Sequence, residues 1–391
     1  MSKLWIGNGR LVLPERIMEA GSALIEDGKI TAVGVGCPAD AQQVDVQGAY
    51  ILPGFIDIHV HGGGNADFMD GELEAFSQAA KAHCAHGTTA LCPTTMTCPD
   101  EFLEETIDLF LEAKKQPTGG AELLGLHLEG PYFSSASKGA QPVGEQRIPD
   151  EKTLNAILDR AQGTILRWDA APELDNMELF ARVMKDRGVM VSLAHSACTA
   201  EKALEAFSWG FSHVTHFYNA CTTFHKVDGI VHSGTVEATY ISDDVTVELI
   251  GDGCHIPRES MLLAYRIKGA DKICLITDSM RAAGTDDKES ILGSKHCGVP
   301  VVVKDDVAQL TDLSSYAGSI ATMDRCLRTA HVKYGIPLTD VSKMLSLTPA
   351  RLIGVSDRKG SIEVGKDADI VIMDEGFTVK DVYVKGRRFE G

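Results

Sequence analysis

The sequence lacks three features that mark other classes of protein. No two of its ten cysteines form a C-x-x-C pair, and they are spread through 391 residues, unlike the dense disulfide framework of a small secreted domain. It has no apolar run of about 18 residues, so we expect no membrane span. It has no basic excess either, because 55 Asp and Glu outnumber 37 Lys and Arg, giving a net charge of −18. This charge argues against nucleic acid or an anionic membrane as the main partner, although a small anionic substrate needs only a local cationic pocket.

The chain length and the N-terminal residues set further limits. A chain of 391 residues is too long for one small core and suits a large barrel with an accessory domain. Residues 1–5 contain neither a long apolar run nor a cleavage site, so we expect no signal peptide and a cytoplasmic location.

The middle of the chain alternates strand-like and helix-like stretches, which is typical of a parallel α/β domain. The helix-like stretches are 72–86, 100–114, 150–160, 176–187, 199–207 and 258–268. The strand-like runs number eight: 55–60, 88–92, 123–128, 164–169, 189–194, 213–216, 245–250 and 273–277. Eight such strands predict a TIM-type (β/α)8 barrel, whose active site lies at the C-terminal ends of the strands.

The two ends of the chain lack the alternation of strands and helices that is seen in the middle. Residues 1–52 and 354–391 contain short strands and turns. Because chain termini often lie close together, the two segments predict one small β-sandwich. We therefore expect two domains, the terminal β-sandwich (1–52 with 354–391) and the barrel (53–353).

The first predicted barrel strand, within Pro53–Gly64, carries two histidines. Side chains alternate along a strand, so Asp57, His59 and His61 share one face. Two histidines on one face can bind a divalent metal, but they can equally be satisfied core histidines. This strand alone leaves both interpretations open.

Other predicted strands end in groups of the same kind. Glu129 ends the third strand, His195 follows the fifth, His216 ends the sixth and Asp278 follows the eighth. A carboxylate on an inner barrel face is costly to bury unless it is paired or metal-bound. With the two histidines of the first strand, these residues form a nitrogen and oxygen set suited to Zn²⁺ or another first-row divalent metal. His127, one layer below Glu129, is expected to support the ligands.

This set predicts a metal-dependent hydrolase, which needs a Lewis acid, a water of lowered pKa and a group that moves protons. Glu129, His195 and His216 could hold one metal. The two histidines of the first strand could hold a second, with Glu129 or Asp278 bridging. Asp278 is the preferred general base, which takes a proton from the water and gives it to the departing amine. The alternatives make Asp278 only a ligand or a structural group.

Ten short motifs are together far more specific than a histidine pair. They are PGFIDIHVHG (53–62), GTT (87–89), GLHLEGPYF (125–133), KGA (138–140), APE (171–173), AHS (194–196), THFYNA (215–220), DGCHI (252–256), TDSM (277–280) and AGS (317–319). On these motifs the chain resembles, nearly end to end, the N-acetylglucosamine-6-phosphate deacetylase family of the amidohydrolase superfamily.

The resemblance implies a barrel with a terminal β-sandwich, and hydrolysis of N-acetylglucosamine 6-phosphate to glucosamine 6-phosphate and acetate. It implies a homodimer with one or two divalent metals per chain, zinc being preferred over iron, cobalt or manganese. It makes Asp278 the catalytic acid and base. The metal ligands that it implies are Glu129, His195 and His216, with His59 and His61 for a second metal.

The resemblance also implies a set of substrate contacts: Ala140, Asn219, Ala220, His225, Lys226, His255, Leu313 and Ala317. Two departures from the family pattern stand out. Lys226 takes the place of an arginine that reaches the phosphate, often across a dimer interface, and offers a point charge instead of a bidentate fork. Gln141 stands where a histidine is common. Both changes are expected to lie near the substrate rather than near the metal.

These departures keep other substrates open. N-acetylgalactosamine 6-phosphate or another N-acylated compound could replace the main candidate. Amidohydrolases of other substrate classes, such as cyclic amides, often carry a carboxylated lysine on the fourth strand, and residues 166–170 contain no lysine. A non-catalytic scaffold is disfavoured because such proteins tend to lose ligands, whereas all six candidates are present.

Overall fold

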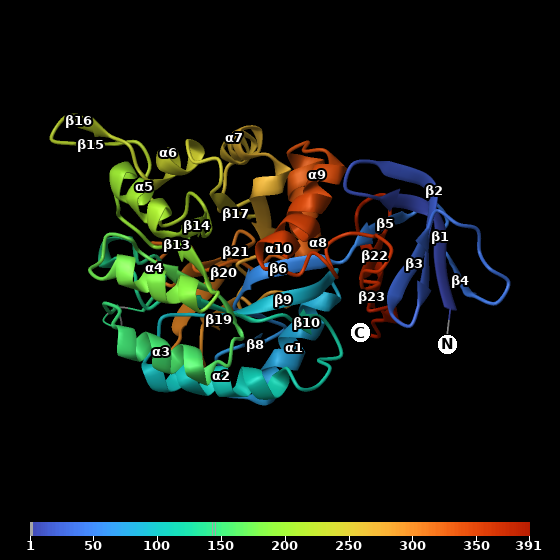
Figure 1. Ribbon diagram of the computed structural model, residues 1–391, viewed down its shortest axis with the longest axis horizontal. Helices are drawn as coiled ribbons and strands as arrows, with labels where there is room; N and C mark the ends of the chain where they lie inside the picture. Colours follow the sequence, from blue (N-terminus) through green and yellow to red (C-terminus); the bar gives the residue numbers. More distant parts are fainter. Residues whose placement is uncertain (1–2, 143, 145) are drawn as a thin grey trace.

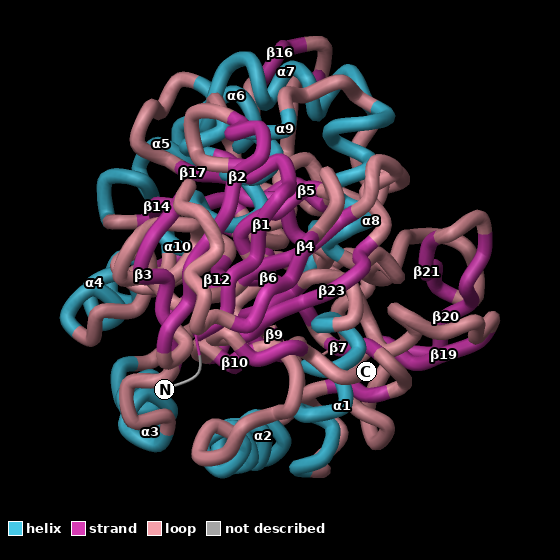
Figure 2. Tube along the Cα trace, turned by 90° about the vertical axis from the view of Figure 1, so that its right-hand side faces the viewer, coloured by secondary structure: helices cyan, strands magenta, loops and turns pink. Residues whose placement is uncertain are grey.

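The computed structural model describes residues 3–142, 144 and 146–391, and the protein has two parts of unequal size (Figure 1). The larger part is a barrel of parallel strands, and the smaller is a sheet that contains both ends of the described chain. When the molecule is turned by 90°, the strands occupy the centre and most helices lie around them (Figure 2).

The barrel contains eight parallel strands, and all eight overlap the predicted runs. They are β6 (Phe55–Val60), β9 (Thr88–Thr95), β11 (Leu126–Glu129), β12 (Ile165–Ala170), β13 (Met190–Leu193), β14 (Phe211–Val214), β17 (Thr246–Ile250) and β18 (Ile273–Ile276). Each pairs in parallel with the next in this order, which confirms the predicted TIM-type barrel.

The barrel closes between β18 and β6 through contacts at the site predicted from the sequence. The backbone N–H of Asp278 donates to the carbonyl oxygen of His59 at 3.0 Å. One layer below, the Thr277 hydroxyl donates to Asp57 Oδ2 at 2.5 Å, and burial raises the pKa of Asp57 to about 7. The closure therefore fixes Asp278 beside His59.

Seven helices lie outside these strands, six of them within two residues of the predicted bounds. They are α1 (Leu73–Cys84), α2 (Asp100–Ala113), α3 (Glu151–Arg160), α4 (Met177–Asp186), α5 (Ala200–Trp209), α6 (Thr235–Tyr240) and α7 (Arg258–Lys268). Helix α6 and the later α8 (Met323–Leu327), α9 (Leu338–Ser342) and α10 (Thr348–Leu352) have no predicted counterpart. The helices turn apolar side chains inward, such as Phe76 of α1 and Phe180 of α4, both 0% exposed. Burying a side chain of this size contributes roughly 1.5–3 kcal/mol.

Strands from both ends of the chain join, as the sequence predicts, and they do so in one eight-stranded sheet. From the N-terminal side come β1 (Lys3–Val12), β2 (Ile17–Glu26), β3 (Lys29–Val33), β4 (Gln42–Asp45) and β5 (Tyr50–Pro53). From the C-terminal side come β22 (Ile370–Met373), β23 (Val379–Val384) and β24 (Arg387–Arg388). The two sets join where β22 runs antiparallel to β5, directly before the first barrel strand.

A buried lysine ties this sheet to the barrel. The Lys359 ammonium is 2.5 Å from Asp369 Oδ2 and 2.9 Å from Glu122 Oε2, and its side chain is 0% exposed. Glu122 belongs to β10 (Glu122–Leu123), at the edge of the barrel sheet, whereas Asp369 precedes β22. A paired charge at this depth links the two parts of the molecule.

Two small β insertions extend from the barrel. The hairpin of β15 (His225–Val227) and β16 (Ile230–His232) projects away from the body of the molecule (Figure 1). A three-stranded sheet of β19 (Glu289–Leu292), β20 (Val299–Lys304) and β21 (Val307–Leu310) follows the eighth barrel strand. None of the helices in the described ranges has the length and apolar character needed to cross a bilayer.

Candidate active site

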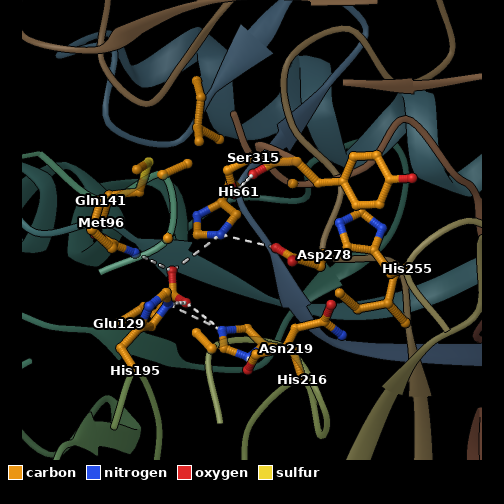
Figure 3. Close-up of a pocket in the computed structure, with 17 residues that line it drawn as sticks. His61, Met96, Glu129, Gln141, His195, His216, Asn219, His255, Asp278 and Ser315 are labelled. Carbon is orange, nitrogen blue, oxygen red and sulfur yellow. Dashed lines mark hydrogen bonds and ion pairs between the residues drawn. The ribbon is translucent and has the colours of Figure 1, made fainter. Parts of the chain in front are cut away.

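The six candidate residues for metal binding and catalysis meet at the C-terminal rim of the barrel, and five of them, all except His59, are shown in Figure 3. Three of them lie two residues beyond a strand and share a left-handed backbone, with φ of 46° at His195, 29° at His216 and 48° at Asp278. Residues other than glycine rarely adopt this backbone conformation. It costs of order 1–3 kcal/mol at such a residue and tends to occur at functional sites. The turn that it makes directs each side chain back over the end of the barrel (Figure 3).

Glu129 is the centre of the first ligand group. Its Oε1 lies 3.0 Å from His195 Nε2 and 3.1 Å from His216 Nε2, and these two nitrogens are 3.1 Å apart. The opposite ring nitrogens donate to backbone carbonyls, His195 Nδ1–H to Ser137 at 3.0 Å and His216 Nδ1–H to Asn219 at 3.1 Å. The two Nε2 atoms are therefore the ones left to bind a cation.

The second ligand group uses the other side of Glu129. His61 Nε2 lies 3.4 Å from Glu129 Oε2 and 3.3 Å from Asp278 Oδ1. His59 Nε2 lies 3.4 Å from the same Asp278 oxygen and 3.9 Å from Glu129 Oε1. One carboxylate thus faces both histidine pairs, and Asp278 stands over the pair from the first strand.

These histidines and carboxylates shift one another's pKa values. Burial alone would raise the pKa of Glu129, but hydrogen bonds with His195 and His216 hold it well below its usual range. Burial would lower the pKa of His216, yet Glu129 raises it to about 9, and Asp278 with Glu129 raises that of His61 to about 9. Protons on these rings balance the carboxylates, and a bound cation would displace them.

The donor set fits a divalent metal. Two groups of three buried residues each bring their ligand atoms within 4.8 Å of one another: His59, His61 and Glu129, and Glu129, His195 and His216. His59 Nε2 is buried and has no hydrogen-bond partner among the described residues, although it faces two carboxylates. Imidazole nitrogens with carboxylate oxygens suit zinc and other first-row divalent ions.

A cavity of about 150 Å³ opens beside these ligands, and four of the predicted substrate residues line it: Ala140, Asn219, Ala220 and His255. Leu313 and Ala317 do not line it, but their neighbours Ser315, Tyr316 and Gly318 do. His225 and Lys226 lie on the projecting hairpin and are not among the lining residues of their own chain.

One prediction about the site is only partly right. Gln141 lines the cavity, as expected of a residue near the substrate, but its Nε2–H also donates to Glu129 Oε2 at 2.8 Å, so it lies beside a candidate metal ligand as well. Its Oε1 accepts the backbone N–H of Thr97 at 3.0 Å, so both ends of the amide are held. Gln141 and Glu129 are 12 residues apart in the chain, and the local sequence does not encode their contact.

Three further residues support the site and were missed as functional candidates. His255 Nδ1–H donates to Asp252 Oδ2 at 2.7 Å, so Asp252 orients the imidazole in the cavity. Deeper in the barrel, Arg167 pairs with Glu248. His127, predicted to support the ligands, accepts a hydrogen bond from Arg167 Nη2 at 2.7 Å. A charged residue at an inward position of an apolar strand was the available signal for Arg167 and Glu248.

Comparison with known proteins places the chain in a family. The amidohydrolase family model matches residues 50–389, so this chain belongs to the amidohydrolase family of carbon–nitrogen hydrolases, which confirms the resemblance seen in the sequence. It is 34% identical over 369 residues to N-acetylglucosamine-6-phosphate deacetylase of Bacillus subtilis (strain 168), a match that covers 93% of this chain and 91% of that one. It is 31% identical over 379 residues to N-acetylgalactosamine-6-phosphate deacetylase of Escherichia coli O157:H7, covering 97% of each. The crystal structure of N-acetylglucosamine-6-phosphate deacetylase from Pasteurella multocida covers all of both chains with a TM-score of 0.92 at 28% identity.

Proposed function

We propose that this protein hydrolyses the N-acetyl group of N-acetylglucosamine 6-phosphate to glucosamine 6-phosphate and acetate. The observation that carries the proposal is the position of Asp278, whose Oδ1 lies within 3.4 Å of two candidate ligand histidines at the wall of the cavity. Relatives that act on this substrate align over nearly the whole chain. We also propose two domains, a terminal β domain of residues 1–52 with 354–391 and a catalytic barrel of residues 53–353.

We assign Glu129, His195 and His216 to one metal position, and His59 and His61 with Glu129 to a second. A divalent ion held there, preferably zinc, lowers the pKa of a bound water and polarises a carbonyl group. Glu129 is the ligand common to both groups of described residues, with Oε1 nearest to His195 and His216 and Oε2 facing His61.

The charge of the barrel interior supports the binding of a divalent ion. Four buried carboxylates have a lowered pKa and are ionised at neutral pH: Glu129, Asp278, Glu248 and Asp169. The permanent cation that faces them is Arg167, so four negative charges against one positive leave three to be balanced. One divalent ion would balance two of these three charges, and either a proton on His61 or a second ion would balance the third.

The proton transfers are assigned to Asp278. His59 and His61 keep its pKa low despite burial, so the carboxylate is ready to accept a proton from the attacking water at neutral pH. It then returns that proton to the departing amine. His255, held by Asp252, faces the same cavity and is assigned to the sugar and the acetyl carbonyl.

The phosphate end of the substrate is assigned to backbone N–H groups of Asn219 and Ala220 and to Lys226 with His225. Asn219 and Ala220 line the cavity, and Ala220 has a left-handed backbone with φ of 49°, a conformation found in backbone anion sites. Lys226 is on the projecting hairpin, so we propose that it reaches the cavity of the partner subunit in a homodimer.

The exposed apolar surface supports this dimer. Among the exposed large apolar side chains of the described residues, seven lie between residues 204 and 267, on the hairpin and the neighbouring helices α5 to α7. These are Leu204, Phe224, Ile230, Val231, Ile241, Leu263 and Ile267. Exposed apolar side chains gathered on neighbouring elements of the chain would suit a protein interface.

A second substrate has a specific observation in its favour. The galactosamine relative matches this chain over 97% of both lengths, and the lysine at position 226 changes the phosphate contact. N-acetylgalactosamine 6-phosphate is therefore the second candidate, ahead of other N-acyl compounds. Buried thiols at Cys84, Cys92, Cys274 and Cys326 support the reducing cytoplasm as the location.

A substrate panel tests the function. Acetate release is measured with N-acetylglucosamine and N-acetylgalactosamine, each with and without the 6-phosphate, together with the metal content of the purified protein. We expect the 6-phosphate of glucosamine to react fastest. Equal rates without phosphate would remove the phosphate assignment, and full activity without metal would refute the proposal.

Lys226→Ala tests the phosphate contact, with Lys152→Ala on α3 as a control that changes an exposed lysine outside the hairpin and the proposed dimer surface. We expect Lys226→Ala to raise KM for the phosphorylated sugar about tenfold and to leave kinetics with the unphosphorylated sugar unchanged. A similar change in both variants would contradict the assignment.

A further inference from the structure

The imidazole of His59 differs from those of the other candidate ligands in what holds its second nitrogen. His195 and His216 donate Nδ1–H to backbone carbonyls, and His61 Nδ1 has no hydrogen-bond partner among the described residues. His59 Nδ1–H donates instead to a carboxylate, Glu248 Oε2, at 3.0 Å. This bond fixes the tautomer and leaves His59 Nε2 free to face Glu129 and Asp278.

The same carboxylate oxygen reaches the other ligand group. Glu248 Oε2 accepts the backbone N–H of His216 at 3.2 Å, so one atom contacts a residue of each metal position. The second oxygen, Oε1, is paired with Arg167 and lies 3.6 Å from His213 Nε2. Glu248 is 0% exposed, and the guanidinium supplies the positive charge that lets a carboxylate remain ionised at this depth.

We propose that Glu248 is a positioning residue that selectively tightens the metal position of His59 and His61. At that position Glu248 orients a ligand side chain, whereas at the other it touches only the backbone of His216. Hydrogen bonds from ligand histidines to carboxylates usually change metal affinity by 10- to 100-fold. Glu248 therefore determines whether this chain holds its second metal.

Metal binding itself provides the test, and the inference rests on the two metal positions of the proposed function. Zinc is titrated into wild-type protein and Glu248→Gln against a competing chromophoric chelator, which yields the number of equivalents and their dissociation constants. We expect wild type to bind two equivalents. In Glu248→Gln the second equivalent should weaken about 10- to 100-fold, with the first changing less than threefold.

A matched control is His213→Asn, since His213 approaches the other oxygen of the same carboxylate but belongs to neither ligand group. Both equivalents should stay within threefold of wild type in this variant. If Glu248→Gln does not fold, Glu248→Asp keeps the buried negative charge that balances Arg167 but shortens the side chain by one methylene, which weakens its bond to His59, and the same selective loss is expected.

Wild-type affinity for both equivalents in Glu248→Gln would overturn the inference and leave the proposed function intact. Equal weakening of both equivalents would also overturn it, because that result marks a general structural role. A single equivalent in wild type, with deacetylation of the sugar phosphate retained, would overturn the inference together with the two-metal assignment but not the reaction.

Discussion

Replacing Asp278 with asparagine tests the proposed chemistry most directly. The change keeps the shape of the side chain and removes its ability to accept a proton. Neither ligand group of three buried residues includes Asp278, so both groups remain complete in the variant. The expected result is a loss of turnover with little loss of metal.

The size of the effect follows from the role. A positioned general base contributes about 10²- to 10⁴-fold to rate, which corresponds to roughly 2.7–5.4 kcal/mol of barrier at about 1.36 kcal/mol per tenfold change. We therefore expect kcat of Asp278→Asn to fall by at least about a hundredfold, with KM changing less. Acetate release gives the rate, and elemental analysis of the same sample gives the metal equivalents.

Asp324→Asn is the matched control. Asp324 is a buried carboxylate, 6% exposed, that contacts Thr322 and Arg328 instead of the cavity, so the same substitution should leave kcat within about threefold. A kcat near wild type in Asp278→Asn with both metals present would refute the base assignment. A parallel loss of metal and rate would show that Asp278 acts as a ligand, which is the alternative that the sequence left open.

Three further predictions concern stability. Lys359→Met should lower the free energy of unfolding by about 3–5 kcal/mol, because Asp369 and Glu122 lose their buried counter-charge; urea unfolding measures it. Burial would raise the pKa of Glu122, but Lys359 holds it at about 2, below the usual 4.5. The stability that the ionised Glu122 contributes is therefore complete above pH 4.5 and is lost as the pH falls toward 2. Glu122→Gln should accordingly lose less stability than wild type between pH 5 and pH 3. Dialysis against a chelator should lower Tm, and zinc at a hundredfold excess over Kd should restore about 2.7 kcal/mol of stability per site. A Tm that does not change would contradict metal binding.

The strand ends were predictable because two rules of geometry suffice for them. Parallel barrel strands end at one rim, and alternation along a strand decides which side chains face inward. These rules place His59, His61 and Glu129 together without knowledge of any contact. His195 and Asp278 follow their strands, and their left-handed backbones, which turn them over the rim, could not be read from the sequence.

The partners of those residues needed the three-dimensional register. Glu248 and Arg167 stand on β17 and β12, which are separated by two other strands in the barrel sheet, so no local pattern pairs them. Each could nevertheless be recognised in the sequence as a charged residue within an apolar strand, since such a residue must find a partner when it is buried. For Gln141 only half of the answer could be read from the sequence: its place beside KGA pointed to the cavity, which it lines, but not to the hydrogen bond between its amide and Glu129.

The cost of this site explains why a metal should matter for folding as well as for catalysis. Left-handed backbones at His195, His216 and Asp278 cost of order 1–3 kcal/mol each, and the ionised carboxylates around them resist burial. Protonated rings at His61 and His216 offset part of this repulsion, with a pKa of about 9 for each. Those protons leave as the pH rises, whereas a divalent ion keeps its charge. The difference in stability between the metal-bound and the metal-free protein should therefore be largest above pH 9, where the rings no longer supply the compensating charge.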